Sequence, residues 1–314
     1  MAHADSIQAA LALGDRRANE VLSFRAAQLA RREAVLQDAR LQRMTFGSEA
    51  EVSPEMVAAA GPAGRGALVA EGDSWFDYPM TDVLRILEDV HGYDVDSVAH
   101  KGDRIEEMAY TGGQLEELTR TVEKLLRRRV VPRAILLSGG GNDVSGDEFG
   151  MLLNHRESPA PGFNVRMLDG LFGDRIALAY VSILRAVTRV CEAKLQRRIP
   201  IVVHGYDHPV PDGRGFIGGW WFLPGPWLEP GFREKGYAAV EERIVLAAAL
   251  IDRFNAMLQR IAAMAEFDHV RYVDLRGTLS NAAGDYAEFW ANELHPTPKG
   301  FELVANRLAQ ALQT

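Results

Sequence analysis

Apolar runs alternate with stretches of helical periodicity from residue 66 onward. The runs are rich in Ala, Val, Ile and Leu and are bounded by Gly, Pro or charged residues, which is typical of buried strands. They lie at Ala67–Ala70, Tyr93–Ala99, Ala134–Ser138, Pro200–His204 and His269–Asp274. Apolar residues recur with helical spacing over Met80–Asp89, Gly113–Arg129, Phe172–Arg197, Lys235–Ala265 and Pro298–Leu312. This alternation predicts a central parallel sheet of about five strands with helices on both faces.

The first 45 residues follow another pattern. They are rich in Ala, Arg, Leu, Gln and Glu and contain no Pro, which favours one long helix. Leucines recur every seven residues, at Leu22, Leu29 and Leu36. The second seam of a coiled coil would contain Arg25 and Arg32, whereas a sustained coiled coil needs two apolar seams. A helix docked on its own domain is therefore favoured over a homo-oligomer formed through this helix, and both alternatives stay open.

Small residues and two prolines between Gly47 and Gly66 indicate a linker. We therefore expect two units in the chain. A helical extension with its linker occupies residues 1–60, and an α/β domain occupies residues 61–314.

Composition narrows the classes of function. Hydrophobic residues make up 47% of the 314 residues, and the net charge is −8, so we expect an acidic globular protein without nucleic acid or an anionic membrane as its main partner. A single cysteine, Cys191, excludes an intrachain disulfide. The first residues lack the basic start of a secretory signal, and no run approaches the ~20 apolar residues of a transmembrane segment. A cytoplasmic location is the resulting expectation.

Ser74 stands directly after the first predicted strand. The strand Ala67–Ala70 breaks at Glu71-Gly72-Asp73 and then presents the serine. Open α/β folds place ligand crevices at this rim of the sheet. Gly, Asp and Ser are also common turn residues, so this block alone does not establish a site.

Three further blocks resemble the first in their position at the ends of elements. Gly102 lies in Ala-His-Lys-Gly-Asp after the second strand, Asn142 lies in Gly-Gly-Gly-Asn-Asp after the third, and His295 lies in Asn-Glu-Leu-His-Pro before the last helix. Acyl transfer needs a nucleophile, a base and donors aimed at the oxyanion. Ser74, His295, and the Gly102 N–H with the Asn142 amide are candidates for these roles.

These four blocks resemble those of the SGNH hydrolase superfamily, the GDSL-type esterases and lipases. The order of the blocks agrees over residues 66–312. The resemblance implies a three-layer flavodoxin-like fold and a serine hydrolase that cleaves carboxylic esters through an acyl-enzyme. It assigns Ser74 as the nucleophile and His295 as the base, and it assigns the Ser74 amide, Gly102 and Asn142 to the oxyanion hole. The expected partner is a small-molecule ester, and no cofactor is expected.

One position departs from the family pattern. The acidic member of the triad normally lies three residues before the histidine, where this chain has Asn292. Asn292 can orient His295 through its side-chain oxygen, Glu293 can turn in instead, or a backbone carbonyl can support a Ser–His dyad. The departure also leaves open a weak or inactive binding protein on the same fold. A carbohydrate acetylesterase is a further alternative, because the family acts on acetylated sugars among other esters.

Two long inserts, Gly139–Leu171 and Gly205–Gly236, leave the same rim of the predicted sheet. Long ordered loops at such positions are usually functional. We count aromatic residues of the second insert, together with the residue after Ser74, as candidate substrate-binding residues: Trp75, Trp220, Trp221, Phe222 and Trp227. They can form an apolar wall for an acyl group, or they can form a satellite core under the loop.

Other chemistries fit less well. Phe76 occupies the place of the second glycine in a Gly-x-Ser-x-Gly elbow, which argues against the α/β-hydrolase fold. The glycine run before Asn142 lacks the Gly-Lys-Ser/Thr ending of a phosphate loop. His204 and His208 are separated by Gly205 and followed by Pro209, so they are a poor helical metal pair, and we expect no metal.

Overall fold

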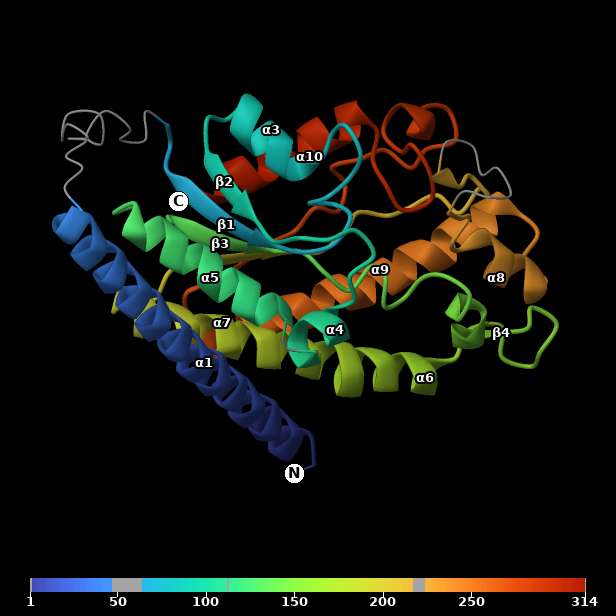
Figure 1. Ribbon diagram of the computed structural model, residues 1–314. Helices are drawn as coiled ribbons and strands as arrows, with labels where there is room; N and C mark the ends of the chain where they lie inside the picture. Colours follow the sequence, from blue (N-terminus) through green and yellow to red (C-terminus); the bar gives the residue numbers. More distant parts are fainter. Residues whose placement is uncertain (1, 47–63, 112, 217–223, 314) are drawn as a thin grey trace.

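A five-stranded parallel sheet forms the centre of the protein in a computed structural model that describes residues 2–46, 64–111, 113–216 and 224–313 (Figure 1). The strand order is β2-β1-β3-β6-β7. The strands are β1 (Ala67–Glu71), β2 (Asp94–Ser97), β3 (Ala134–Leu137), β6 (Ile201–His204) and β7 (Val270–Val273). This order is that of the flavodoxin-like folds, in which ligands bind outside the carboxyl ends of the strands. The predicted fold class is therefore confirmed.

The apolar runs of the sequence correspond to strands that are buried in the sheet. Every residue of the three central strands β1, β3 and β6 is buried, because helices cover both faces of the sheet. The edge strands β2 and β7 contain exposed or half-buried residues. Leu68 lies opposite Val95 of β2 on one side and Ala134 of β3 on the other, which fixes the register of the centre.

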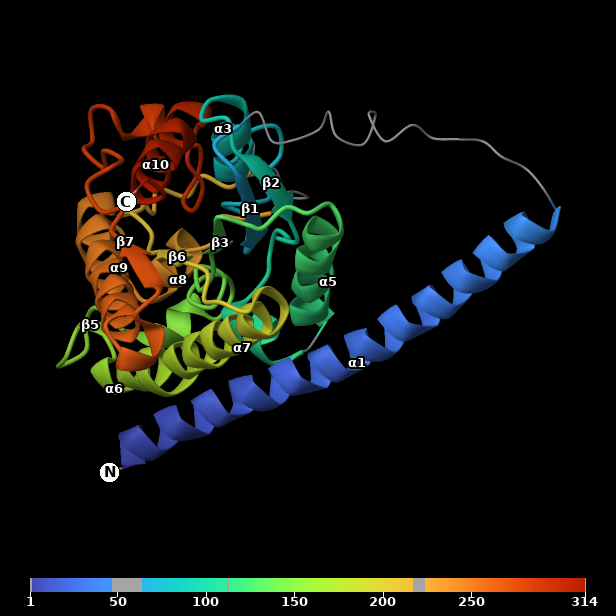
Figure 2. The ribbon, with the colours of Figure 1, turned by 90° about the vertical axis from the view of Figure 1, so that its left-hand side faces the viewer.

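Helices form a layer on each face of the sheet. The helices α3 (Val83–Asp89) and α10 (Pro298–Ala311) pack together on one face. The other face carries α5 (Gly113–Arg127), α7 (Ala177–Leu195) and α9 (Val240–Ala262), which pack side by side (Figures 1 and 2). The helix predicted from Met80 begins at Val83 because the Asp82 side chain caps it by accepting from the Arg85 N–H at 2.9 Å.

The two long inserts contain short elements. The first holds the turn η1 (Phe149–Leu152), the strands β4 (Leu153–Asn154) and β5 (Gly162–Phe163), and the helix α6 (Val165–Asp169), which a π-helical segment η2 (Gly170–Ile176) joins to α7. The second holds α8 (Glu229–Glu234), and the helix predicted from Lys235 begins at Val240. The inserts pack on each other, since α8 contacts η1 and the rings of Phe149 and Phe232 lie 4.8 Å apart.

The N-terminal helix α1 (Ala2–Phe46) forms a further layer outside α7 (Figure 2). Its docked side carries small and apolar residues at helical spacing: Ala10, Leu11, Gly14, Ala18 and Val21. A Cβ at Gly14 would lie 2.5 Å from the carbonyl oxygen of Ser182, so glycine lets the two helices approach closely. Arg185 binds Asp15 at 2.7 Å, and Arg25 binds Glu116 and Glu123 of α5.

The C-terminal part of α1 extends away from the sheet (Figure 2). Residues 30–37 are all exposed, and Leu36 in the heptad series exposes 45% of its surface. Leu22 packs partly against the core, so part of the series serves intramolecular docking. Oligomerisation through α1 stays a prediction. Most of the predicted linker lies outside the described residues.

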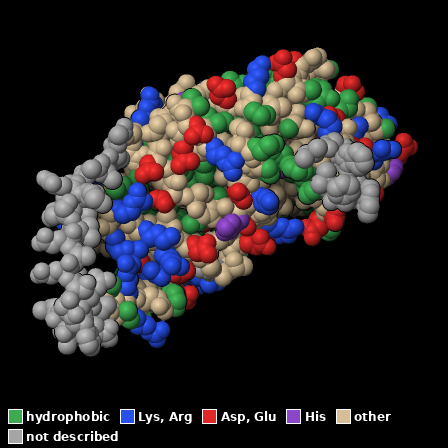
Figure 3. All heavy atoms as spheres, turned by 45° about the horizontal axis from the view of Figure 1, so that its top comes forward, with side chains coloured by type: hydrophobic (Ala, Val, Ile, Leu, Met, Phe, Trp, Pro, Cys, Tyr) green, Lys and Arg blue, Asp and Glu red, His purple; other side chains and the backbone are tan. Residues whose placement is uncertain are grey.

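Side chains of both charges are interspersed over the face seen in Figure 3, and Lys and Arg side chains gather at its lower left. In the part of the chain that the structure describes, none of the helices combines the length and the apolar character that crossing a membrane requires.

Candidate active site

Ser74 lies just beyond the carboxyl end of β1, in a tight turn. The N–H groups of Phe76 and Asp77 both donate to the carbonyl of Asp73, at 3.0 and 3.1 Å. A Cβ at Gly72 would lie 2.8 Å from the Cβ of Ser138, so the turn can pass over β3 only with glycine at this position. The turn leaves the Ser74 side chain half-buried at the rim of the sheet.

The structure brings Ser74 and His295 together although 221 positions separate them in the chain. The Ser74 Oγ lies 2.7 Å from the His295 Nε2. His295 precedes α10, whose first turn is fixed by Pro298 and by the Thr297 side chain, which accepts from the Gly300 N–H at 3.1 Å. This helix start places the imidazole over the serine.

Asn292 contacts the other ring nitrogen of His295. Its Oδ1 lies 3.0 Å from His295 Nδ1 and also accepts the backbone N–H groups of Leu294 at 3.0 Å and His295 at 2.9 Å. Two fixed backbone donors define which end of the amide faces the imidazole, because only oxygen can accept from them. Nδ1 therefore carries the proton, and Nε2 is left as the acceptor that faces Ser74.

Aromatic rings enclose His295. The Tyr78 ring stacks on the imidazole at 4.4 Å, and its hydroxyl accepts from Asn292 Nδ2 at 3.2 Å. The Trp227 ring meets the imidazole edge-on at 5.5 Å. Burial in these surroundings lowers the pKa of His295 to about 3, so the imidazole is neutral at physiological pH.

Glu293 does not contact His295. Its carboxylate accepts four backbone N–H groups: those of Gly213 at 3.0 Å, Trp227 at 2.7 Å, Leu228 at 2.7 Å and Glu229 at 3.1 Å. The side chain is fully buried. Of the two side chains considered for orienting His295, the geometry therefore favours Asn292, and Glu293 anchors the second insert instead.

Gly102 and Asn142 lie next to Ser74. Asn142 Nδ2 donates one hydrogen to the carbonyl of Asp103 at 2.9 Å, which leaves its second hydrogen for a ligand. Gly102 has a φ of +92°, a conformation that favours glycine. Within the described residues, neither its N–H nor that of Ser74 donates a hydrogen bond. Ser74, Gly102 and Asn142 line the same cavity, and each has a donor hydrogen without an acceptor among the described residues.

The four blocks fit one family. The GDSL-like lipase/acylhydrolase family model matches residues 62–303. The chain belongs to this family. This match confirms the resemblance to the SGNH hydrolases and places the chain in a family of lipases and acylhydrolases.

The chain is also similar to several solved structures at low sequence identity. A carbohydrate acetylesterase from Sinorhizobium meliloti, Est24, is 12% identical over 79% of this chain and 99% of its own, with a TM-score of 0.42. A member of the lipolytic G-D-S-L family from Veillonella parvula is 12% identical over 79% and 98%, with a TM-score of 0.41. The acetylxylan esterase Axe2 from Geobacillus stearothermophilus is 13% identical over 81% and 96%, with a TM-score of 0.39. No curated protein matches the chain.

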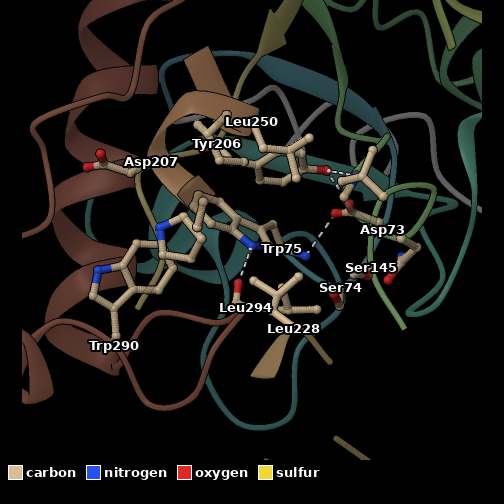
Figure 4. Close-up of a pocket in the computed structure, with 16 residues that line it drawn as sticks. Asp73, Ser74, Trp75, Ser145, Tyr206, Asp207, Leu228, Leu250, Trp290 and Leu294 are labelled. Atoms are coloured by element: carbon tan, nitrogen blue, oxygen red, sulfur yellow. Dashed lines mark hydrogen bonds between the residues drawn. The ribbon is translucent and has the colours of Figure 1, made fainter. Parts of the chain in front are cut away.

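A buried polar network lies beneath the serine of this GDSL family member. Asp73 Oδ1 accepts from the Trp75 N–H at 3.0 Å and from the Ser138 hydroxyl at 2.9 Å. Tyr206, after β6, donates its hydroxyl to Asp73 Oδ2 and accepts the Gly141 N–H at 3.2 Å. Tyr206 thus links the serine turn to the loop that carries Asn142 (Figure 4). Tyr206 is not predictable as a site residue, because nothing in its local sequence marks it.

Two cavities meet at Ser74. The narrow cavity has a volume of about 50 Å³ and lies between Ser74 and the buried rings of Trp75, Tyr206 and Trp290 (Figure 4). The aromatic cleft has a volume of about 470 Å³ and is lined by His295, Gly102, Tyr78, Phe216 and Trp227 among others. Ser74, Asn142 and Leu294 line both spaces.

The aromatic residues predicted to bind substrate therefore do not line a single pocket. Trp75 is a buried wall of the narrow cavity, and its indole N–H donates to the carbonyl of Leu294 at 3.0 Å. Trp227 lines the aromatic cleft on the side of His295. Trp220, Trp221 and Phe222 lie outside the described residues.

Within the described part of the chain, His, Cys, Asp and Glu side chains form no group of three or more that could hold a metal ion.

Proposed function

We propose that the protein is a serine esterase that works through an acyl-enzyme. The observation that carries the proposal is the chain of contacts from the Ser74 Oγ through His295 to the Asn292 Oδ1, at 2.7 and 3.0 Å. A neutral imidazole with its free nitrogen on the serine hydroxyl is the arrangement of a general base and its nucleophile.

The reaction follows from these positions. His295 Nε2 accepts the hydroxyl proton as the Ser74 Oγ attacks the ester carbonyl. The N–H groups of Ser74 and Gly102 and the Asn142 amide stabilise the oxyanion. His295 then gives its proton to the departing alkoxide, and water releases the acid from Ser74 by the same route in reverse.

Asn292 has a supporting role in this scheme. An amide holds the imidazole in its reactive tautomer, as in the Cys-His-Asn arrangement, without providing a full negative charge. The two backbone N–H groups on its oxygen prevent the flipped amide, which would present a donor to Nδ1. This geometry supports an enzyme over an inactive binding protein.

Fluorophosphonate labelling with hydrolysis of p-nitrophenyl acetate tests the proposal. We expect the wild type to be labelled at Ser74 and to turn over, and Ser74→Ala to lose both. Ser182→Ala is the control, because this serine lies buried on α7 and its hydroxyl has no partner among the described residues. An unlabelled Ser74 in a folded protein would favour the inactive binding protein.

A further inference from the structure

The two cavities at Ser74 are lined by different members of the proposed catalytic group. His295 and Gly102 line the aromatic cleft, whereas the lining of the narrow cavity contains Ser74 and Asn142 without His295. An ester bound at Ser74 must extend in two directions from its carbonyl carbon, one toward the acyl chain and one toward the alcohol. The position of His295 decides between them.

The alcohol part of the ester must lie in the aromatic cleft. The ester oxygen that leaves must receive its proton from His295 Nε2, and donor and acceptor must come within hydrogen-bond distance for that transfer. Only the aromatic cleft offers this contact. The acyl chain then points away from the imidazole, past Asn142, into the narrow cavity.

The narrow cavity limits the length of that chain. One water-sized atom needs about 10–15 Å³ of cavity volume, so the cavity of about 50 Å³ holds roughly four such atoms. Its exposed lining surface is mainly apolar, with Val144, Leu228, Leu250 and Trp290 among its walls. Leu250 and Trp290 are buried at 3% and 1% exposure.

The walls of the narrow cavity are also held in place. The Trp75 indole is hydrogen-bonded to Leu294, and the Tyr206 hydroxyl is hydrogen-bonded to Asp73. Ring contacts join Trp75 to Tyr206 at 5.0 Å and to Trp290 at 6.4 Å. A longer chain would have to displace several packed rings, which well-packed interiors resist.

We infer that this chain is a short-acyl esterase, which accepts acyl groups of about two to four carbons on bulky alcohols. The inference rests on the proposed function. During acylation the bond between the acyl carbon and the alcohol oxygen breaks, and the bond to the Ser74 Oγ forms. The serine proton passes through His295 to the alcohol. Water then supplies a hydroxyl to the acyl carbon and returns a proton to Ser74.

This assignment changes the role expected for the tryptophans of the second insert. The sequence suggested that they form an acyl pocket, whereas Trp227 lies beside His295 and therefore on the alcohol side. Together with Tyr78 and Phe216 it provides an apolar, aromatic surface for the alcohol. The acyl group is selected by Leu250 and its neighbours instead.

A series of p-nitrophenyl esters from acetate to octanoate tests the inference. We expect kcat/KM to fall at least about tenfold between butyrate and octanoate, because a single misfitting methylene in a pocket already costs about this factor. Leu250→Ala should move the preference toward hexanoate. Ala247→Val, which narrows the same cavity from α9, should reduce hydrolysis of butyrate more than that of acetate.

Leu258→Ala is the matched control, since Leu258 is equally buried on α9 but does not line either cavity. It should lower stability without moving the chain-length profile. Trp227→Ala should raise KM for 1-naphthyl acetate relative to ethyl acetate and leave the acyl profile unchanged. A protein that is labelled at Ser74 and hydrolyses octanoate as fast as acetate would overturn the short-acyl assignment alone. A protein that is neither labelled nor active would overturn the proposed function.

Discussion

The side-chain oxygen of Asn292 lies 3.0 Å from His295 Nδ1 and is fixed there by the backbone N–H groups of Leu294 and His295. A neutral amide thus occupies the place where the SGNH resemblance leads one to expect a carboxylate. It orients the imidazole while burial holds the pKa of His295 at about 3. The imidazole is therefore neutral over a wide range of pH.

The pH profile of Asn292→Asp should differ from that of the wild type. The reaction needs neutral His295, so activity is lost as pH falls through the pKa of its imidazole. In the wild type this acid limb lies far below the ordinary histidine value of 6.5, since burial lowers that pKa to about 3. A carboxylate beside Nδ1 stabilises the imidazolium, so the acid limb of kcat/KM should move up by about 1–3 pH units. An unmoved limb would mean that residue 292 does not face the imidazole.

Substitutions at Asn292 and Glu293 should affect different properties. Asn292→Ala removes the acceptor at Nδ1 and should lower kcat while the melting temperature changes less. Glu293→Gln places an NH₂ group against backbone donors and should cost about 1–3 kcal/mol of stability, measured by urea unfolding, with the exposed Glu302→Gln as control. Loss of kcat in Glu293→Gln at unchanged stability would instead make Glu293 the group that orients His295.

Tyr206→Phe should reduce turnover without a matching rise in KM. The variant removes the hydroxyl that joins Asp73 to the Gly141 N–H, so the Ser74 turn and the Asn142 loop lose their fixed spacing. Small misplacements of reacting groups cost up to about 100-fold in rate. Tyr272→Phe is the matched control, because its hydroxyl donates to Asn255 at 2.6 Å and lines neither cavity. Equal kinetic effects in both variants would show that the role is only structural.

Glu71 should make the protein less stable at alkaline pH. Burial, together with the nearby Asp103 carboxylate, raises the pKa of this carboxyl from 4.5 to about 9. A group whose pKa is raised on folding stabilises the folded state below pH 4.5, and this contribution is lost as pH rises through 9. The stability of Glu71→Gln relative to the wild type should therefore increase from pH 5 to pH 9 in urea unfolding. Glu302→Gln should show no such trend.

Gly14→Ala should destabilise the protein although alanine is the better helix former. Helix propensity alone favours alanine by about 1 kcal/mol, but the new Cβ would lie 2.5 Å from the carbonyl oxygen of Ser182. Gly173→Ala is the matched control, because a Cβ there has open space and the residue is also helical. A higher melting temperature for Gly14→Ala would show that α1 does not pack on α7 in solution.

The sequence predicts the sheet well because β1, β3 and β6 are buried on both faces and appear as uninterrupted apolar runs. Short helices such as α4 (Ile105–Tyr110) and α8 are not found, since five or six residues cannot display a helical period. The roles of Glu293 and Tyr206 cannot be predicted from the sequence for another reason. Glu293 binds backbone groups, which carry no sequence signature, and Tyr206 meets Asp73 across 133 positions only because β6 and β1 both flank β3.

The docking of α1 on α7 also constrains the order in which the chain folds. The helix Ala2–Phe46 precedes its main partner, Ala177–Leu195, in the chain, and β1, β2 and β3 lie between them. Contacts between segments so distant in sequence form late, because the intervening loop must first be closed. We therefore expect the apolar stripe of α1 to stay unpaired while β1, β2 and β3 are synthesised, and its attachment to the outside of α7 to follow formation of the sheet rather than to nucleate it.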